Sequence, residues 1–122
     1  MRDANLTGVQ IPLPPHMNTL SQYQNKVNDI ATEFNLQWSV YVEYIHLVEE
    51  MGELGEALTV QQKDRKPGNG KQALADHIDV KEELGDVLFT VLALSNLLQV
   101  NLTEVLDSTF KRYRGKLNER QI

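Results

Sequence analysis

The sequence predicts an all-α fold, with a protomer of four to five helices arranged as a bundle. Two observations carry this prediction. Apolar residues recur at three- and four-residue steps in four separate segments, and no segment alternates polar and apolar residues as a half-buried strand does. A chain of 122 residues is long enough for one domain with its own core. We therefore predict an irregular, proline-bearing arm over residues 1–18 and a single domain over residues 19–122.

The first two helices are predicted over residues 19–34 and 40–62. The apolar positions of the first helix follow one face, at Leu20, Tyr23, Val27, Ile30, Ala31 and Phe34. Ser39 is the expected N-cap of the second helix, because its hydroxyl can accept a hydrogen bond from the first turn. A polar loop with glycine and proline follows over residues 63–71.

The third helix is the most apolar segment of the chain. Asp79 and Glu82 have the spacing of a capping box, so the helix begins at Asp79 or, alternatively, near residue 72. It continues to about residue 99 and is apolar nearly all round over residues 87–98, which requires cover on every side. One protomer of this size only just provides that cover, so we expect a homodimer that pairs helices across a two-fold axis.

The fourth helix is opened by a second capping box, in which Asn101 precedes Glu104 by three residues. It ends in a basic stretch, FKRYRGKLNER. Basic residues in a last turn are also favoured by the helix dipole.

The composition excludes several classes of function. The formal net charge is −5, from 12 basic and 17 acidic side chains, and such a surface repels nucleic acid. The chain has no cysteine, so disulfides and thiolate metal sites are excluded. No apolar run reaches the roughly 20 residues of a membrane span. We expect a cytoplasmic protein with no nucleic-acid or membrane partner.

Two pairs of acidic residues have helical spacing. Glu50 and Glu53 share one face of the second helix, and Glu83 and Asp86 share one face of the third. Antiparallel packing would bring the pairs together, and four adjacent carboxylates repel unless protons or a cation lie among them. Oxygen ligands without a thiolate favour Mg²⁺ or Mn²⁺. The alternative is a solvated helix surface, with ion pairs to residues such as Lys81.

Three glycines, Gly52, Gly55 and Gly85, lie within these two segments. A mid-helix glycine costs about 1 kcal/mol relative to alanine. We predict that a close approach of the two helices offsets this cost, either to bring the carboxylates together or simply for tight packing.

The segments EEMGELGEAL and KEELGDVLFTVLAL carry a family resemblance. They resemble the MazG-like, all-α nucleoside triphosphate pyrophosphohydrolases, a superfamily that includes dimeric dUTPases, and the match extends over about residues 19–114. The resemblance implies a homodimer or a dimer of dimers, a role in nucleotide-pool cleaning, and Mg²⁺-dependent hydrolysis of a nucleoside triphosphate between the α- and β-phosphates. It leaves open a dUTPase or a phosphoribosyl-ATP pyrophosphohydrolase of the same superfamily. The metal ligands that it implies are Glu50, Glu53, Glu83 and Asp86.

The remaining site predictions concern water and substrate. Glu49 and Glu50 are the candidate catalytic acids, with Glu49 either a ligand to another ion or the base that orients water. Trp38 is a candidate to stack on the nucleobase, although a lone tryptophan also suits a core. His46 is expected to line this face rather than to bind metal. The candidate phosphate contacts are Lys111, Arg112 and Arg114.

Two other classes of protein also have acidic pairs on helices. A di-iron carboxylate bundle needs Glu-x-x-His on two helices, and neither acidic pair supplies the histidine. A non-catalytic helical interaction module, with the acids as surface decoration, stays open.

Overall fold

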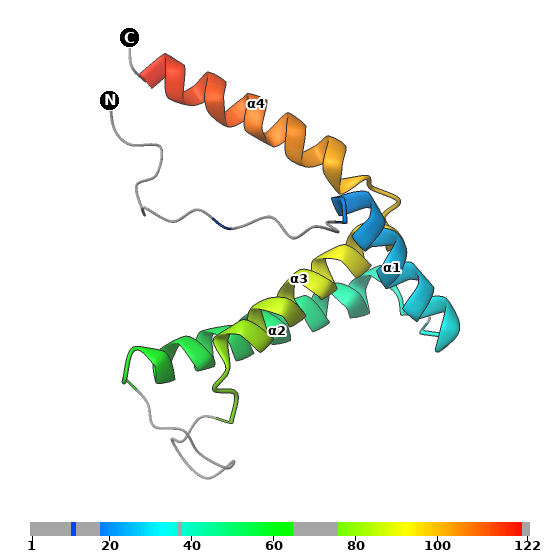
Figure 1. Ribbon diagram of the computed structural model, residues 1–122, viewed down its shortest axis with the longest axis vertical. Coiled ribbons are helices and arrows are strands. Elements are labelled where there is room, and N and C mark those ends of the chain that lie inside the picture. The colour runs from blue at the N-terminus through cyan, green and yellow to red at the C-terminus, as the bar shows by residue number, and fades with distance from the viewer. Residues whose placement is uncertain (1–10, 12–17, 37, 65–75, 121–122) are drawn as a thin grey trace.

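The computed structural model describes residues 11, 18–36, 38–64 and 76–120, which form helices and connecting turns without a strand (Figure 1). The predicted all-α class is therefore confirmed. The helices are α1 (Leu20–Glu33), α2 (Val40–Gln61), α3 (Val80–Leu97) and α4 (Leu102–Arg120). Most of the predicted arm lies outside the described residues, as does the stretch near residue 72 that is the alternative predicted start of α3. The domain boundary at residue 18 stays a prediction.

The helices begin where the sequence places their caps. Thr19 and Gln22 form a reciprocal capping box at α1, and the Ser39 hydroxyl accepts a hydrogen bond of 3.2 Å from the backbone N–H of Val42. Asp79 Oδ1 accepts from two N–H groups in the first turn of α3, at 3.0 and 3.2 Å. Asn101 Oδ1 does the same at α4, at 2.9 and 3.3 Å. The predicted N-caps are therefore confirmed.

Three helices end in the same way, at a residue with left-handed backbone. Asn35, Lys63 and Gln99 have φ values of 53°, 64° and 55° and follow the caps of α1, α2 and α3. In each case the next N–H bonds back to a carbonyl five residues earlier, at 2.8 to 2.9 Å. Glycine is the usual residue at such positions, and its absence makes these ends hard to see in the sequence.

α2 and α3 lie side by side and antiparallel, and this pair makes the most extensive helix contact of the fold (Figure 1). α1 packs against α3 and also touches the start of α4. α4 leaves α3 at a bend of 105° and extends away from the other three helices. No single described helix is long and apolar enough to cross a membrane; α3 and α4 meet that criterion only when taken together across their bend.

One buried side chain joins three of the helices, in what we call the Gln24 junction. Gln24 is 7% exposed, and its Nε2 donates to Ser95 Oγ at 2.9 Å and to Val100 O at 2.8 Å. Its Oε1 accepts from the backbone N–H of Leu102 at 3.0 Å, and Asn96 Nδ2 donates to the Gln24 carbonyl at 2.8 Å. The junction thus fastens α1 to the end of α3 and the start of α4.

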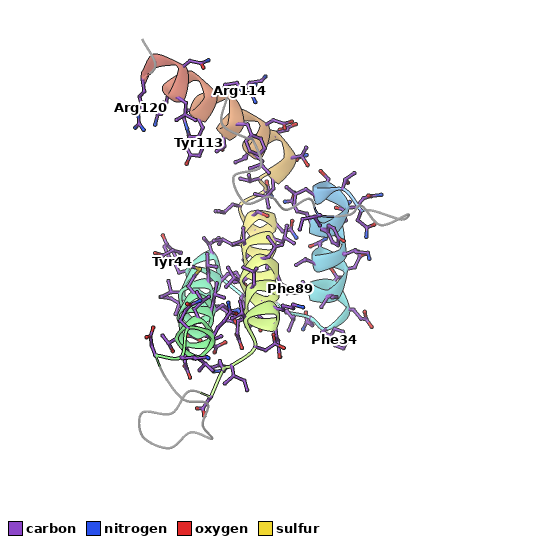
Figure 2. All side chains as sticks on the ribbon, turned by 60° about the vertical axis from the view of Figure 1, so that its left-hand side comes forward. Phe34, Tyr44, Phe89, Tyr113, Arg114 and Arg120 are labelled. Carbon is purple, nitrogen blue, oxygen red and sulfur yellow. The ribbon has the colours of Figure 1, made fainter. Side chains whose placement is uncertain are left out.

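The protomer buries little apolar surface. Among the described residues only three apolar side chains are buried, those of Val27, Ala57 and Leu92. The expected enclosure of α3 is not achieved within one protomer, since Leu88 and Leu98 are 55% and 52% exposed. α4 buries no residue and carries an exposed apolar stripe (Figure 2). The stripe consists of Leu106, Phe110, Tyr113 and Leu117.

Candidate metal centre

The two acidic pairs face each other between α2 and α3, as the sequence predicts. One ligand atom from each of Glu50, Glu83 and Asp86 lies within 4.8 Å of the other two. Glu53 and Glu83 form a second such group with His77. We call the four acids the carboxylate seam. Glu83 belongs to both groups, so the seam has room for one cation or for two neighbouring cations.

Helix geometry explains this arrangement. Residues three apart lie on one face, and antiparallel packing turns the two acidic faces toward each other. Glu83 lies in the first turn of α3, where the helix dipole favours a negative charge. It is 5% exposed, whereas the side chain of Glu53 is 33% exposed. The seam therefore runs from a buried floor at Glu83 to a mouth open to solvent.

The floor of the seam leaves buried oxygen atoms without partners. Among the described residues, Glu50 Oε2 and Glu83 Oε2 are buried and accept no hydrogen bond. Burial raises the pKa of Glu50, and the nearby Glu53 carboxyl raises it further, against the opposing effect of His46. Burial also raises the pKa of Glu83, with Glu53 and Asp86 adding to the effect and His77 opposing it. A divalent cation would give the unpartnered oxygens a ligand and would offset the repulsion among the carboxylates. The set of oxygen ligands therefore fits Mg²⁺ or Mn²⁺.

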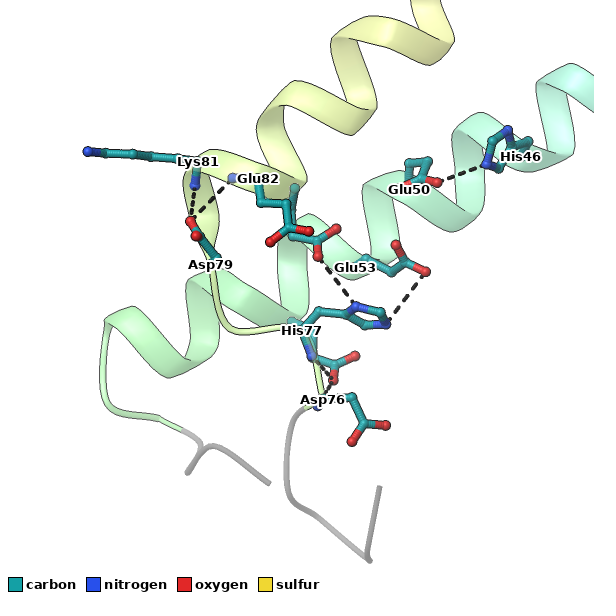
Figure 3. Close-up of polar contacts among 10 residues, drawn as sticks. His46, Glu50, Glu53, Asp76, His77, Asp79, Lys81 and Glu82 are labelled. Carbon is teal, nitrogen blue, oxygen red and sulfur yellow. Dashed lines mark hydrogen bonds and ion pairs between the residues drawn. The ribbon is translucent and has the colours of Figure 1, made fainter. Parts of the chain in front are cut away.

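His77 is a component of the site that sequence reasoning missed. Its Nε2 lies 3.5 Å from Glu53 Oε1 and its Nδ1 lies 3.4 Å from Glu83 Oε1 (Figure 3). Glu56 Oε1 places it there by accepting hydrogen bonds from the backbone N–H groups of Asp76, at 2.6 Å, and His77, at 3.4 Å. Burial lowers the pKa of His77, but the carboxylates around it raise that pKa by more, so the net shift is upward. The one signal in the sequence was its position two residues before the cap of α3.

His46 connects the seam to a cavity. Its Nε2 lies 2.8 Å from Glu50 Oε1, and its Nδ1 lies 3.5 Å from Glu43 Oε1 without forming a hydrogen bond. The Trp38 ring meets the imidazole edge to face, with centroids 5.1 Å apart at 73°. Trp38, Glu43 and His46 line a cavity of about 170 Å³, together with side chains of α1 and α3 such as Phe89. Trp38 therefore lies at a cavity beside the carboxylates, and its base-stacking role stays a prediction.

The structure does not bring the other predicted residues to the seam. Glu49 is exposed and belongs to neither ligand group; it lines a separate surface pocket with Trp38 and Tyr41. The basic candidates are exposed on α4, which extends away from α2 and α3 (Figure 2). Their roles stay predictions. The residues concerned are Lys111, Arg112 and Arg114.

The predicted role of the glycines is wrong within the protomer. A Cβ atom added at Gly52, Gly55 or Gly85 would meet nothing within 4 Å. The small residue that α2 buries is Ala57, which is fully enclosed. A side chain at any of the three positions would therefore have open space around its Cβ atom within the protomer.

Comparisons with known proteins agree with this geometry. The model of the MazG nucleotide pyrophosphohydrolase domain matches residues 43–121, which hold the whole carboxylate seam. The chain belongs to the MazG family. The matched MazG region begins inside α2, so α1 and Trp38 lie before it.

The chain is similar to YpjD of Bacillus subtilis. It is 34% identical over 74 residues to the uncharacterized protein YpjD of strain 168, a match that covers 61% of this chain and 63% of that protein, less than two thirds of its length. The crystal structure of YPJD, described as a candidate pyrophosphatase, superimposes with a TM-score of 0.67 at 28% identity. That superposition covers 80% of this chain and 94% of YPJD. The fold shared with YPJD thus extends over most of the molecule.

Proposed function

We propose that this MazG-family protein hydrolyses a nucleoside triphosphate between the α- and β-phosphates, in the presence of Mg²⁺, to a nucleoside monophosphate and pyrophosphate. One observation carries the proposal: the seam buries carboxylate oxygens that have no partner among the described residues, in a chain that belongs to a nucleotide pyrophosphohydrolase family. A purely structural interface would satisfy or exclude such atoms. The role that we propose for this activity is nucleotide-pool cleaning.

The proposed ligands are the four acids of the seam, with His77 as an additional donor. Mg²⁺ would supply neutralisation of the charge that develops on the phosphates. Mn²⁺ is the alternative ion, because the group of Glu53, Glu83 and His77 includes an imidazole nitrogen, which suits Mn²⁺ better than Mg²⁺.

Glu50 is the proposed base. His46 holds its Oε1 at 2.8 Å, while its Oε2 is without a partner and can accept a proton from water. The water oxygen then bonds to the α-phosphorus, the bond from that phosphorus to the bridging oxygen breaks, and pyrophosphate leaves. Glu49 remains a second candidate to orient the water, from its exposed position.

The proposed assembly is a homodimer or a dimer of dimers. The support is the apolar surface that one protomer exposes, chiefly the stripe on α4 and the open side of α3. A partner that covers α4 is also the arrangement in which its basic residues can reach a phosphate chain. Phe110→Glu is expected to shift the protein to a smaller species in light scattering, and an unchanged mass would contradict this use of the stripe.

The decisive experiment measures products. Purified protein with Mg²⁺ or Mn²⁺ is offered canonical and modified nucleoside and deoxynucleoside triphosphates, phosphoribosyl-ATP included, and pyrophosphate and orthophosphate are scored separately. Monophosphate and pyrophosphate in equal amounts are expected. Orthophosphate as the direct product would contradict cleavage between the α- and β-phosphates, and no turnover of any nucleotide would favour a non-catalytic module.

A further inference from the structure

The cavity beside His46 is suited to an aromatic ring. It lies between α1, α2 and α3, has a volume of about 170 Å³, and has apolar walls that include Val27, Trp38 and Phe89. Trp38 and Phe89 are 43% and 41% exposed, so their rings are available for contact with a ligand. A ligand with phosphates at the carboxylate seam would reach this cavity past His46, which contacts Glu50.

Glu43 is the unexplained polar group of this cavity. It is only 6% exposed, and within the described part of the chain its side chain makes no hydrogen bond. Its one polar neighbour there is His46 Nδ1 at 3.5 Å, an atom that is itself buried without a hydrogen-bond partner. The Glu43 oxygens are not fully enclosed, so a ligand in the cavity can reach them, and a group that donates a hydrogen bond there would be favoured.

The helix dipole does not account for this burial. Glu43 lies in the first turn of α2, where a negative charge is favourable. The same benefit is available at the surface, as at Glu82 and Glu104 in the first turns of α3 and α4, which are both exposed. The cap of α2 is made by Ser39 and does not use the carboxylate.

The cavity also has two amide side chains, Asn28 and Asn96, but neither can replace Glu43 as a selective hydrogen-bond acceptor. Asn96 is committed to the Gln24 junction, since its Nδ2 donates to the Gln24 carbonyl at 2.8 Å and its Oδ1 accepts from Gln24 Nε2 at 3.3 Å. Asn28 is exposed, and an amide both donates and accepts, so it discriminates weakly between bases.

We propose that Glu43 reads the nucleobase and selects bases that carry an exocyclic amino group over uracil and thymine. An ionised carboxylate only accepts hydrogen bonds. The amino groups at C4 of cytosine, C6 of adenine and C2 of guanine donate hydrogen bonds, whereas uracil and thymine have carbonyl oxygens at both C2 and C4, which repel a carboxylate. Trp38 and Phe89 hold the ring, and Glu43 meets its edge. This inference rests on the proposed function, because it places the phosphates at the seam.

The test compares kcat/KM for dCTP, dATP, dGTP, dUTP and dTTP. The wild-type protein is expected to prefer one or more of the amino-bearing bases by roughly 10- to 100-fold, and Glu43→Gln is expected to remove most of that preference because glutamine also donates. Glu104→Gln is the matched control, since it removes an exposed first-turn glutamate at another helix. Preference of the wild type for dUTP or dTTP, or unchanged selectivity in Glu43→Gln, would overturn the proposal.

Calorimetric binding of the monophosphates dCMP, dAMP, dGMP, dUMP and TMP separates the two claims. If nucleotides are hydrolysed without a preference that depends on Glu43, the proposed function stands and the proposed role of Glu43 in base selection is overturned. If amino-bearing monophosphates bind selectively but no nucleotide is hydrolysed, base selection by Glu43 stands and the proposed function is overturned. If Glu43→Gln fails to fold, Glu43→Asp retains the charge but shortens its reach, and the same loss of preference is expected; the wild-type panel decides the direction in every case.

Discussion

The Gln24 junction and the carboxylate seam both bury polar side chains between helices, but they treat the polar atoms in opposite ways. At the junction both atoms of the Gln24 amide are hydrogen-bonded, to α3, to the turn after it and to the start of α4. At the seam Glu50 and Glu83 each keep a buried oxygen without a partner in the described chain. A satisfied group specifies which helices pack together, whereas an unsatisfied one marks a place prepared for a ligand.

The largest expected effect lies at the seam and concerns activity. Glu53→Gln and Asp86→Asn should each reduce turnover by roughly 10²- to 10³-fold, because each removes a negative ligand from the proposed metal site. Thermal stability in chelator should not fall, since a repelling charge has been removed. Steady-state pyrophosphate release measures the loss, with Glu104→Gln as the control. Full activity in either variant would mean that the seam is not the reaction centre.

A substitution at the Gln24 junction should reduce stability rather than activity. Gln24→Leu is expected to lower the free energy of unfolding by about 4 kcal/mol, because four groups lose a partner at about 1 kcal/mol each. These groups are Ser95 Oγ, Asn96 Oδ1, Val100 O and the Leu102 N–H. Urea denaturation at one fixed protein concentration measures this loss, and Asn25→Leu, at an exposed neighbouring position, is the control. A loss of metal affinity as large as the loss of stability would break the distinction between the two regions.

Metal binding should stabilise the protein only through the seam. At a free Mn²⁺ or Mg²⁺ concentration of about 100 times Kd, the stabilisation is about 2.7 kcal/mol. Melting curves with metal and with chelator measure the difference. Gln24→Leu should keep the difference and Glu53→Gln should lose most of it; equal differences in both variants would place the ion elsewhere.

The smallest effect concerns pH in the absence of metal. The folded pKa values of Glu50 and Glu83 lie above their ordinary value of 4.5, so the folded state binds more protons than the unfolded state between that value and the raised ones. Stability in chelator should therefore fall as pH rises through this window, and the raised pKa of His77 acts in the same direction above 6.5. Melting temperatures across mildly acidic to neutral pH measure the slope, and Glu83→Gln should flatten it. A slope of the opposite sign would contradict the unpaired state of these carboxyls.

The same contrast separates what the sequence could predict from what it could not. Helix periodicity and local caps predicted the four helices and their starts, because both signals act within a few residues. The spacing of Glu50 with Glu53 and of Glu83 with Asp86 predicted the seam, since it needs only two faces and an antiparallel pair. His77 was missed because its place is determined by Glu56, some 20 residues earlier, and not by any helical period.

Three further features depend on contacts that a linear pattern does not contain. The burial of Glu43 arises where α1, α2 and α3 meet around one cavity. The direction of α4 depends on the Gln24 junction, so the basic residues could not be placed relative to the seam in advance. Gly52 and Gly55 suggested a close neighbour, but the side of α2 on which they lie is open in the protomer.

The position of Gln24 at the bend makes it a pivot for α4. The 19 residues of α4 form a rod about 28 Å long at 1.5 Å per residue, and within the described chain its contacts are concentrated near its first turn, at α1. A rod held near one end is a lever: a rotation of about 10° at the bend would carry its far end through about 5 Å. The hydrogen bonds of a single amide side chain in α1 therefore help to fix the direction of the α4 axis and, with it, the position of its last turns.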